Sequence, residues 1–73
     1  MNEITIKDFH LMGFQENERK LKLAANIVNN YYKQKKEFTS FYIEIEKSNK
    51  YPLDAIILAK NFHKRFINEM FDG

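Results

Sequence analysis

The stretch NERKLKLAANIVNNYYKQKK, residues 17–36, decides the fold, because its apolar and polar side chains recur with the period of an α-helix. Acidic residues lie near its start and lysines at its end, which is the polarity that the helix dipole favours. We therefore expect a helix over residues 17–35, with Leu23 off the apolar face. The apolar face comprises Leu21, Ala24, Ala25, Ile27, Val28, Tyr31 and Tyr32, and the polar face comprises Arg19, Lys22, Asn26, Asn29, Asn30 and Lys33.

A second amphipathic stretch, residues 53–71, follows Pro52, a residue well suited to the first position of a helix. Its apolar face comprises Ala55, Ile56, Leu58, Ala59, Phe62, Phe66 and Met70. We expect helices over residues 17–35 and 53–70 to be the two longest elements. Four side chains should be buried against one another between them: Val28, Tyr32, Phe62 and Phe66.

The middle segment, residues 38–49, is ambiguous between helix and strand. One helical stripe is formed by Phe38, Phe41, Tyr42 and Ile45. The same segment also alternates as in a strand, with Phe41, Ile43 and Ile45 on one face and Tyr42, Glu44 and Glu46 on the other. We favour the helix and keep the strand as the open alternative.

The N-terminal segment carries the same ambiguity. Thr5 can cap a short helix that Gly13 ends, but Ile4 and Ile6 also alternate as in a strand. The expected fold class is therefore mainly α: a small single domain of three or four helices over residues 1–73. The alternative adds a short strand or hairpin from residues 2–8 and 41–47.

The size of the chain makes a partner a reasonable expectation. With 73 residues and no Cys, the domain has a small core and no disulfide to reinforce it. Seven Phe and four Tyr must supply much of that core. Such a domain gains stability from binding a larger protein or from forming a homodimer.

The composition also bears on the source and the compartment. Residues with AT-rich codons, such as Lys, Asn, Ile and Phe, greatly outnumber Gly, Ala, Arg and Pro, which favours a low-GC bacterium or one of its phages. The longest apolar run, residues 55–59, is far too short to span a bilayer. The start of the chain lacks the pattern of a signal peptide. We expect a cytoplasmic protein with no membrane association.

Charge is concentrated in one part of the chain. Residues 19–36 contain six Lys or Arg and no acid, whereas the segments on either side, residues 1–18 and 37–54, are net acidic. Such a strip suits an acidic protein surface, or the phosphates of DNA or RNA with Asn side chains reaching base edges. It also suits the solvated side of a helix whose other side is core.

The tetrapeptide LMGF, residues 11–14, resembles the Met-Gly-Phe loop that follows the first helix of ubiquitin-associated domains. In that family the loop forms part of the binding surface. The resemblance covers about 25 residues, and the rest of the chain departs from that three-helix pattern. We interpret the tetrapeptide as a helix cap flanked by core residues and assign no family.

Little in the sequence indicates catalysis. The chain has no Cys nucleophile and no Gly-rich phosphate loop, and Glu44 and Glu46 would share a face only on a strand. His63 falls on the apolar side of its helix, where we expect a histidine at the core edge, with a pH-sensitive interface group as the alternative. We expect no enzymatic activity, no cofactor and no metal site.

The function expected from these features is a small protein-binding module, such as a stoichiometric inhibitor or regulator that occludes an acidic surface on a larger intracellular protein. A phage or mobile element acting on host replication, transcription or defence machinery would be a plausible source. The alternative is a small basic DNA- or RNA-binding regulator that uses the same helix. The candidate partner-binding residues are Arg19, Lys22, Leu23, Asn26, Asn29, Lys33, Ile57, Lys64 and Phe71.

Overall fold

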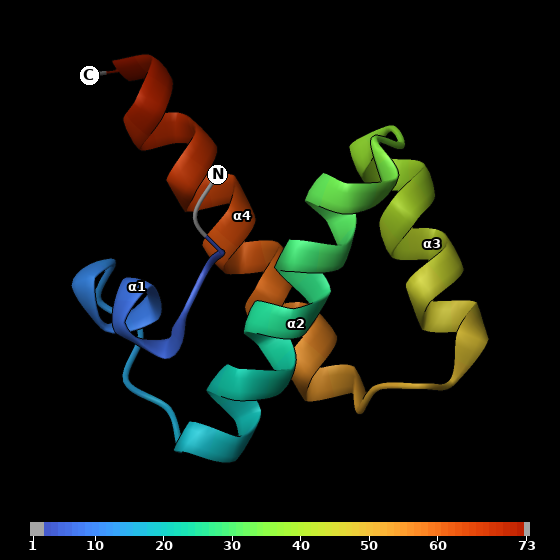
Figure 1. The fold of residues 1–73 in the computed structure, drawn as a ribbon, viewed down its shortest axis with the longest axis horizontal. Helices are drawn as coiled ribbons and strands as arrows, with labels where there is room; N and C mark the ends of the chain where they lie inside the picture. The colour runs from blue at the N-terminus through green and yellow to red at the C-terminus, as the bar shows by residue number, and fades with distance from the viewer. Residues whose placement is uncertain (1–2, 73) are drawn as a thin grey trace.

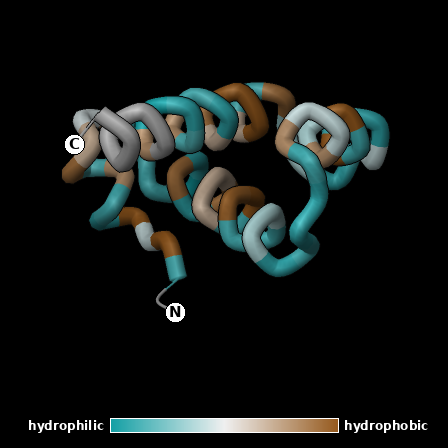
Figure 2. The backbone as a smooth tube through the Cα atoms, turned by 90° about the horizontal axis from the view of Figure 1, so that it is seen from above, coloured by the Kyte–Doolittle hydropathy of each residue, from teal (hydrophilic) through white to brown (hydrophobic). Residues whose placement is uncertain are grey.

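The computed structural model describes the backbone of residues 3–72 and the side chains of residues 3–66. The described chain forms α1 (Ile6–Leu11), α2 (Glu18–Gln34), α3 (Phe38–Ser48) and α4 (Leu53–Asp72). The prediction that the second and last helices are the longest is confirmed. These two cross in the middle of the molecule, with α1 on one side and α3 on the other (Figure 1). Seen from above, α3 and α4 lie along one side and α2 along the other (Figure 2).

Small residues let α2 and α4 approach closely where they cross. Ala24 of α2 and Ala55 and Ala59 of α4 are completely buried. Short side chains at a helix crossing reduce the distance between the two axes. Leu21 and Val28, three residues before and four after Ala24 on the same side of α2, are also completely buried.

The helix α1 is fixed by an aromatic stack. Phe9, its buried residue, stacks on Phe62 of α4 with the ring centroids 4.1 Å apart. The backbone N–H of Thr5 donates to the Asp8 carboxylate at 2.8 Å, which holds the first turn. Gly13 follows the helix with φ +90°, a conformation that other residues adopt only with strain. The interpretation of LMGF as a helix cap agrees with this geometry, but its flanking residues are not all core: Met12 and Phe14 are partly buried against the core, whereas Leu11 is 74% exposed.

The helix α3 is fixed by a second aromatic cluster, centred on His63 of α4. The His63 ring lies 4.5 Å from Tyr31 of α2 and 4.9 Å from Phe38 of α3, centroid to centroid. His63 is 1% exposed, and its Nδ1 has no hydrogen-bond partner among the described residues. The histidine therefore lies inside the core and not at its edge.

Side-chain caps mark where the middle helices begin. The Asn17 side chain accepts from the Lys20 N–H at 2.8 Å at the start of α2. The Glu37 side chain accepts the N–H groups of Thr39 and Ser40 at the start of α3, and these bonds lower the pKa of Glu37. At the other ends, Lys35 and Asn49 adopt the left-handed conformation, which stops each helix.

The alternative of a strand or hairpin from residues 2–8 and 41–47 is wrong, because the described residues contain no strand. The stripe of Phe41, Tyr42 and Ile45 is buried, while Ile43 between them is 46% exposed. As a helix, the segment buries these three side chains against aromatic residues of α2 and α4. Tertiary packing therefore decides this segment in favour of the helix.

The predicted core is half correct. Val28 and Phe62 are completely buried, but Tyr32 and Phe66 are only partly buried. Phe66 lies one turn beyond Phe62 and stacks on it at 5.7 Å, at the edge of the core. Tyr32 lies beside His63 instead, with the ring centroids 5.4 Å apart.

Replacing the central phenylalanine should be far more destructive than replacing its neighbour. Phe62→Ala removes the ring that holds α1 and should cost about 3–5 kcal/mol, the usual loss for a buried aromatic. Phe66→Ala should cost clearly less, because that ring is already partly exposed. Urea denaturation of both variants measures the difference, and equal losses would contradict the placement of Phe66 at the edge.

The stability of the fold should fall on the acid side because of His63. Burial lowers the pKa of His63 from its ordinary 6.5 to about 4, whereas the unfolded chain keeps the ordinary value. Below pH 6.5 the unfolded state therefore binds a proton that the folded state does not. The free energy of unfolding should fall by up to about 3 kcal/mol between pH 6.5 and 4. The titratable groups that face the ring are Tyr31, Tyr32 and Tyr42.

The substitution His63→Phe isolates this contribution, since it keeps an aromatic ring and removes the titrating group. The variant should lose stability less steeply than the wild type as the pH falls, when both are unfolded with urea at several pH values. His10→Phe, at the exposed histidine of α1, is the control. If the free energy of unfolding of His63→Phe falls with pH as steeply as that of the wild type, other groups cause the acid sensitivity.

Candidate functional site

The solvent side of α2 forms the most distinctive surface of the protein. Arg19, Lys22, Asn26 and Lys33 are all exposed and recur at three-, four- and seven-residue intervals along one line of the helix. At the rise of an α-helix, this line is about 21 Å long. We call these four residues the basic stripe. The helix presents it away from α4, because the opposite side of α2 is buried against that helix.

The six cations of residues 19–36 divide into two that form ion pairs and four that form none with the described side chains: Arg19, Lys22, Lys33 and Lys35. Lys20 is bound to Glu16 at 3.1 Å and to Asp54 at 3.4 Å, and the hydrogen bond to Glu16 is the main reason that its pKa is raised. Lys36 is bound to Glu44 at 2.7 Å. These two cations join secondary-structure elements and are neutralised by doing so.

The cations of the basic stripe are not neutralised in this way. Arg19, Lys22 and Lys33 form no ion pair with any side chain that the structure describes. Their positive field is therefore directed into solvent, with an amide, Asn26, between them. Such a surface can attract carboxylates or phosphates and can donate hydrogen bonds to them.

Asn29 belongs to the scaffold. Its side chain accepts from the N–H of Ile4 at 2.8 Å and donates to the C=O of the same residue at 3.0 Å. Both bonds attach the N-terminal segment to the middle of α2. Leu23, another candidate, is partly buried and packs against the core.

The remaining candidates lie elsewhere. Ile57 and Lys64 are exposed on α4, on the side turned away from α2. Since α2 and α4 pack by their buried sides, this surface and the basic stripe point in opposite directions. Phe71 lies outside the residues whose side chains are described. One flat partner surface therefore cannot contact the stripe and Ile57 together.

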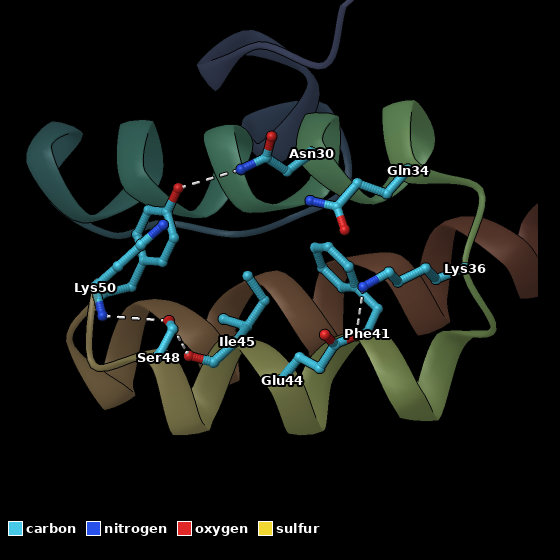
Figure 3. Close-up of a pocket in the computed structure, with 9 residues that line it drawn as sticks. Asn30, Gln34, Lys36, Phe41, Glu44, Ile45, Ser48 and Lys50 are labelled. Atoms are coloured by element: carbon cyan, nitrogen blue, oxygen red, sulfur yellow. Dashed lines mark hydrogen bonds and ion pairs between the residues drawn. The ribbon is translucent and has the colours of Figure 1, made fainter.

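A cleft between α2 and α3 was not anticipated from the sequence. The two helices diverge from their short connection, and the space between them measures about 330 Å³. Figure 3 shows Asn30 and Gln34 of α2 facing Glu44, Ile45 and Ser48 of α3 across it. Local pattern gives no signal for such a cleft, because its walls come from helices whose separation depends on how α3 packs against α4.

Two polar contacts bridge the cleft at its ends. The Lys36–Glu44 ion pair lies near the connection between the helices, and the Asn30 amide donates to the Tyr51 hydroxyl at 3.4 Å near the other end. Lys50, in the loop after α3, also lines this end.

Other kinds of site have no support in the described part of the chain. Glu44 and Glu46 are two residues apart on a helix and so point to different sides, and the first is bound to Lys36. Among the described residues, no group of three His, Asp or Glu side chains is placed to hold a metal ion. Within the same residues, no helix combines the length and apolar character needed to cross a membrane.

The comparisons with known proteins give no family. No protein-family model, curated protein or solved structure matches the chain. The site must therefore be interpreted from its own geometry and charge.

Two asparagines on α2 provide a matched test of which residues are structural. Asn29→Ala should destabilise the protein by about 1–2 kcal/mol, because it leaves the N–H of Ile4 without its partner. Asn26→Ala should change stability by less than about 0.5 kcal/mol, since Asn26 is exposed and forms no hydrogen bond to the described residues. Urea denaturation measures both, and equal effects would show that the bonds of Asn29 contribute nothing.

Proposed function

We propose that this protein is a small protein-binding module that covers an acidic surface on a larger intracellular protein and thereby inhibits or regulates it. The observation that carries the proposal is the basic stripe. Arg19, Lys22 and Lys33 lie along one line of a well-supported helix and have no ion-pair partner among the described side chains. No contact among the described residues accounts for them.

The energetics of α2 support a binding role. An acid placed four residues before a lysine stabilises a helix by about 0.2–0.5 kcal/mol. Glu16 and Lys20 form such a pair. Glu18 stands four residues before Lys22 but forms no ion pair with it, and residue 29, four before Lys33, is an asparagine. Arg19 and Lys22 also lie near the positive end of the helix dipole, where cations are unfavourable. These features make α2 slightly less stable by itself, and the loss is offset when an acidic partner binds the unpaired cations.

The rigidity of α2 supports the same role. Its buried side is fixed against α4, and aromatic clusters on α4 hold α1 and α3 beside it. The stripe is thus preorganised, so binding immobilises little more than the ends of its own side chains. Preorganisation reduces the entropic cost of association.

Nucleic acid is the second candidate, and Asn26 is the observation that favours it. Its exposed amide lies between cations, where it can reach a base edge. Against this, Glu16 and Glu18 are exposed at one end of the stripe and Glu37 and Glu44 near the other. These acids confine the electropositive surface to the length of the stripe. Such a surface suits a small acidic patch on a protein better than the continuous phosphates of a nucleic acid, so we favour a protein partner.

Reversing two charges tests the proposal. In the double variant Arg19→Glu and Lys22→Glu, the melting temperature should stay unchanged or rise slightly, because acids suit the first turns of a helix. Binding to the partner should weaken at least roughly tenfold, as expected when charge pairs across an interface are lost. The partner is first isolated from the lysate of a low-GC bacterium with the wild-type protein, and affinities are then measured by calorimetry.

The control is the double variant Lys7→Glu and Lys47→Glu, which changes the net charge equally at exposed positions outside the stripe. It should bind normally. Nuclease treatment of the lysate separates the two candidates, since a protein partner survives it. Binding to a random duplex that weakens by orders of magnitude with salt would favour nucleic acid. Normal partner binding by the stripe variant would refute the proposal.

A further inference from the structure

The cleft between α2 and α3 has the construction of a binding site. The Lys36–Glu44 ion pair and the Asn30–Tyr51 hydrogen bond bridge its ends, and Tyr31 of α2 packs on Phe41 of α3 with the ring centroids 5.3 Å apart. Phe41 and Ile45, both buried, form its floor. At about 330 Å³, it has the size of a small ligand pocket, or of space for one or two side chains of a partner.

The unused hydrogen-bonding groups in the cleft are mainly donors. Lys50 and Gln34 have no side-chain partner among the described residues. Figure 3 shows Lys50 at the end of the cleft beyond Ser48 and Gln34 on α2, toward the end that Lys36 lines. The Tyr51 hydroxyl accepts a bond from Asn30 and keeps its own proton free to donate.

The charge of the cleft is also positive. Its one acid, Glu44, is already bound to Lys36, so Lys50 remains as an uncompensated cation among the lining residues. A group that accepts several hydrogen bonds and carries negative charge satisfies both conditions. An ionised carboxylate accepts through two oxygens and donates none.

The cleft is continuous with the basic stripe. On α2, Asn30 and Gln34 follow Asn26 and Lys33 by four residues and by one, on the flank that turns toward α3. The α2 wall of the cleft therefore adjoins the stripe, so a segment lying along the stripe can extend a side chain sideways into the cleft. The geometry points to this cleft as the place where the acidic partner inserts a side-chain carboxylate of Asp or Glu, between Lys50 and Gln34. This inference rests on the proposed function, because it specifies how the same partner is recognised.

The test uses a blocked triglutamate peptide as the probe, with blocked triglutamine as its neutral control, and follows amide chemical shifts by NMR. Triglutamate should shift the Gln34 side-chain amide and the backbone amides of Ser48 and Lys50 in a saturable manner, and triglutamine should not. Lys50→Gln should weaken the binding of triglutamate roughly tenfold, since it removes a hydrogen bond to a charged group.

Two further variants separate a specific site from general attraction. Lys47→Gln removes the same charge from an exposed position of α3 that does not line the cleft, and it should change the affinity less than about twofold. Gln34→Leu changes no charge and should nevertheless weaken binding several-fold. Equal effects of Lys47→Gln and Lys50→Gln, or an absence of shifts at the cleft, would overturn the inference.

The outcomes also distinguish this inference from the proposed function. If the cleft does not bind triglutamate while reversal of Arg19 and Lys22 weakens the partner, the carboxylate site is wrong and the proposed function stands. If triglutamate binds in the cleft but the stripe variant retains its partner, the proposed function fails. Stronger shifts with a single-stranded oligonucleotide would assign the cleft to phosphates and overturn the inference.

Discussion

Two consecutive residues of α4, Phe62 and His63, hold the structure together. Neighbouring residues on a helix point in directions about 100° apart. Phe62 therefore stacks on Phe9 of α1, while His63 enters the aromatic cluster of α2 and α3 on the other flank. Both side chains are almost completely buried. A single turn of α4 thereby fixes the positions of the other three helices.

This arrangement leaves the outer side of α2 free. Since α4, α1 and α3 all attach to its buried side or its flanks, the cations of the basic stripe receive no partner from the described side chains, whereas Lys20 and Lys36 at the ends of the same strip do. The fold therefore uses two cations to join elements and directs the others to solvent. This difference, and not the total charge of the chain, is what makes the stripe a candidate site.

The same attachment creates the cleft. The aromatic cluster at the first turns of α3 holds that end of the helix close to α2, but α3 then diverges with only the Asn30–Tyr51 bond near its far end. Within the part of the chain that the structure describes, one ring nitrogen of His63 and the hydroxyl of Tyr42 have no hydrogen-bond partner in this cluster. Buried polar groups without partners cost stability. The position of α3, and therefore the shape of the cleft, depends on an aromatic cluster that is weakened by these two buried polar atoms.

The sequence by itself determined α2 and α4, because their apolar stripes, the N-terminal cap and the single proline act within a few residues of one another. It also determined the basic strip and the long outer face of α2. The tertiary structure alone decided that residues 38–48 are helical, that Asn29 holds Ile4, and that Ile57 and the stripe lie on opposite sides. It likewise decided that His63 is completely buried and that a cleft separates α2 from α3. These features depend on contacts between residues far apart in the chain, and local periodicity carries no information about which buried faces meet.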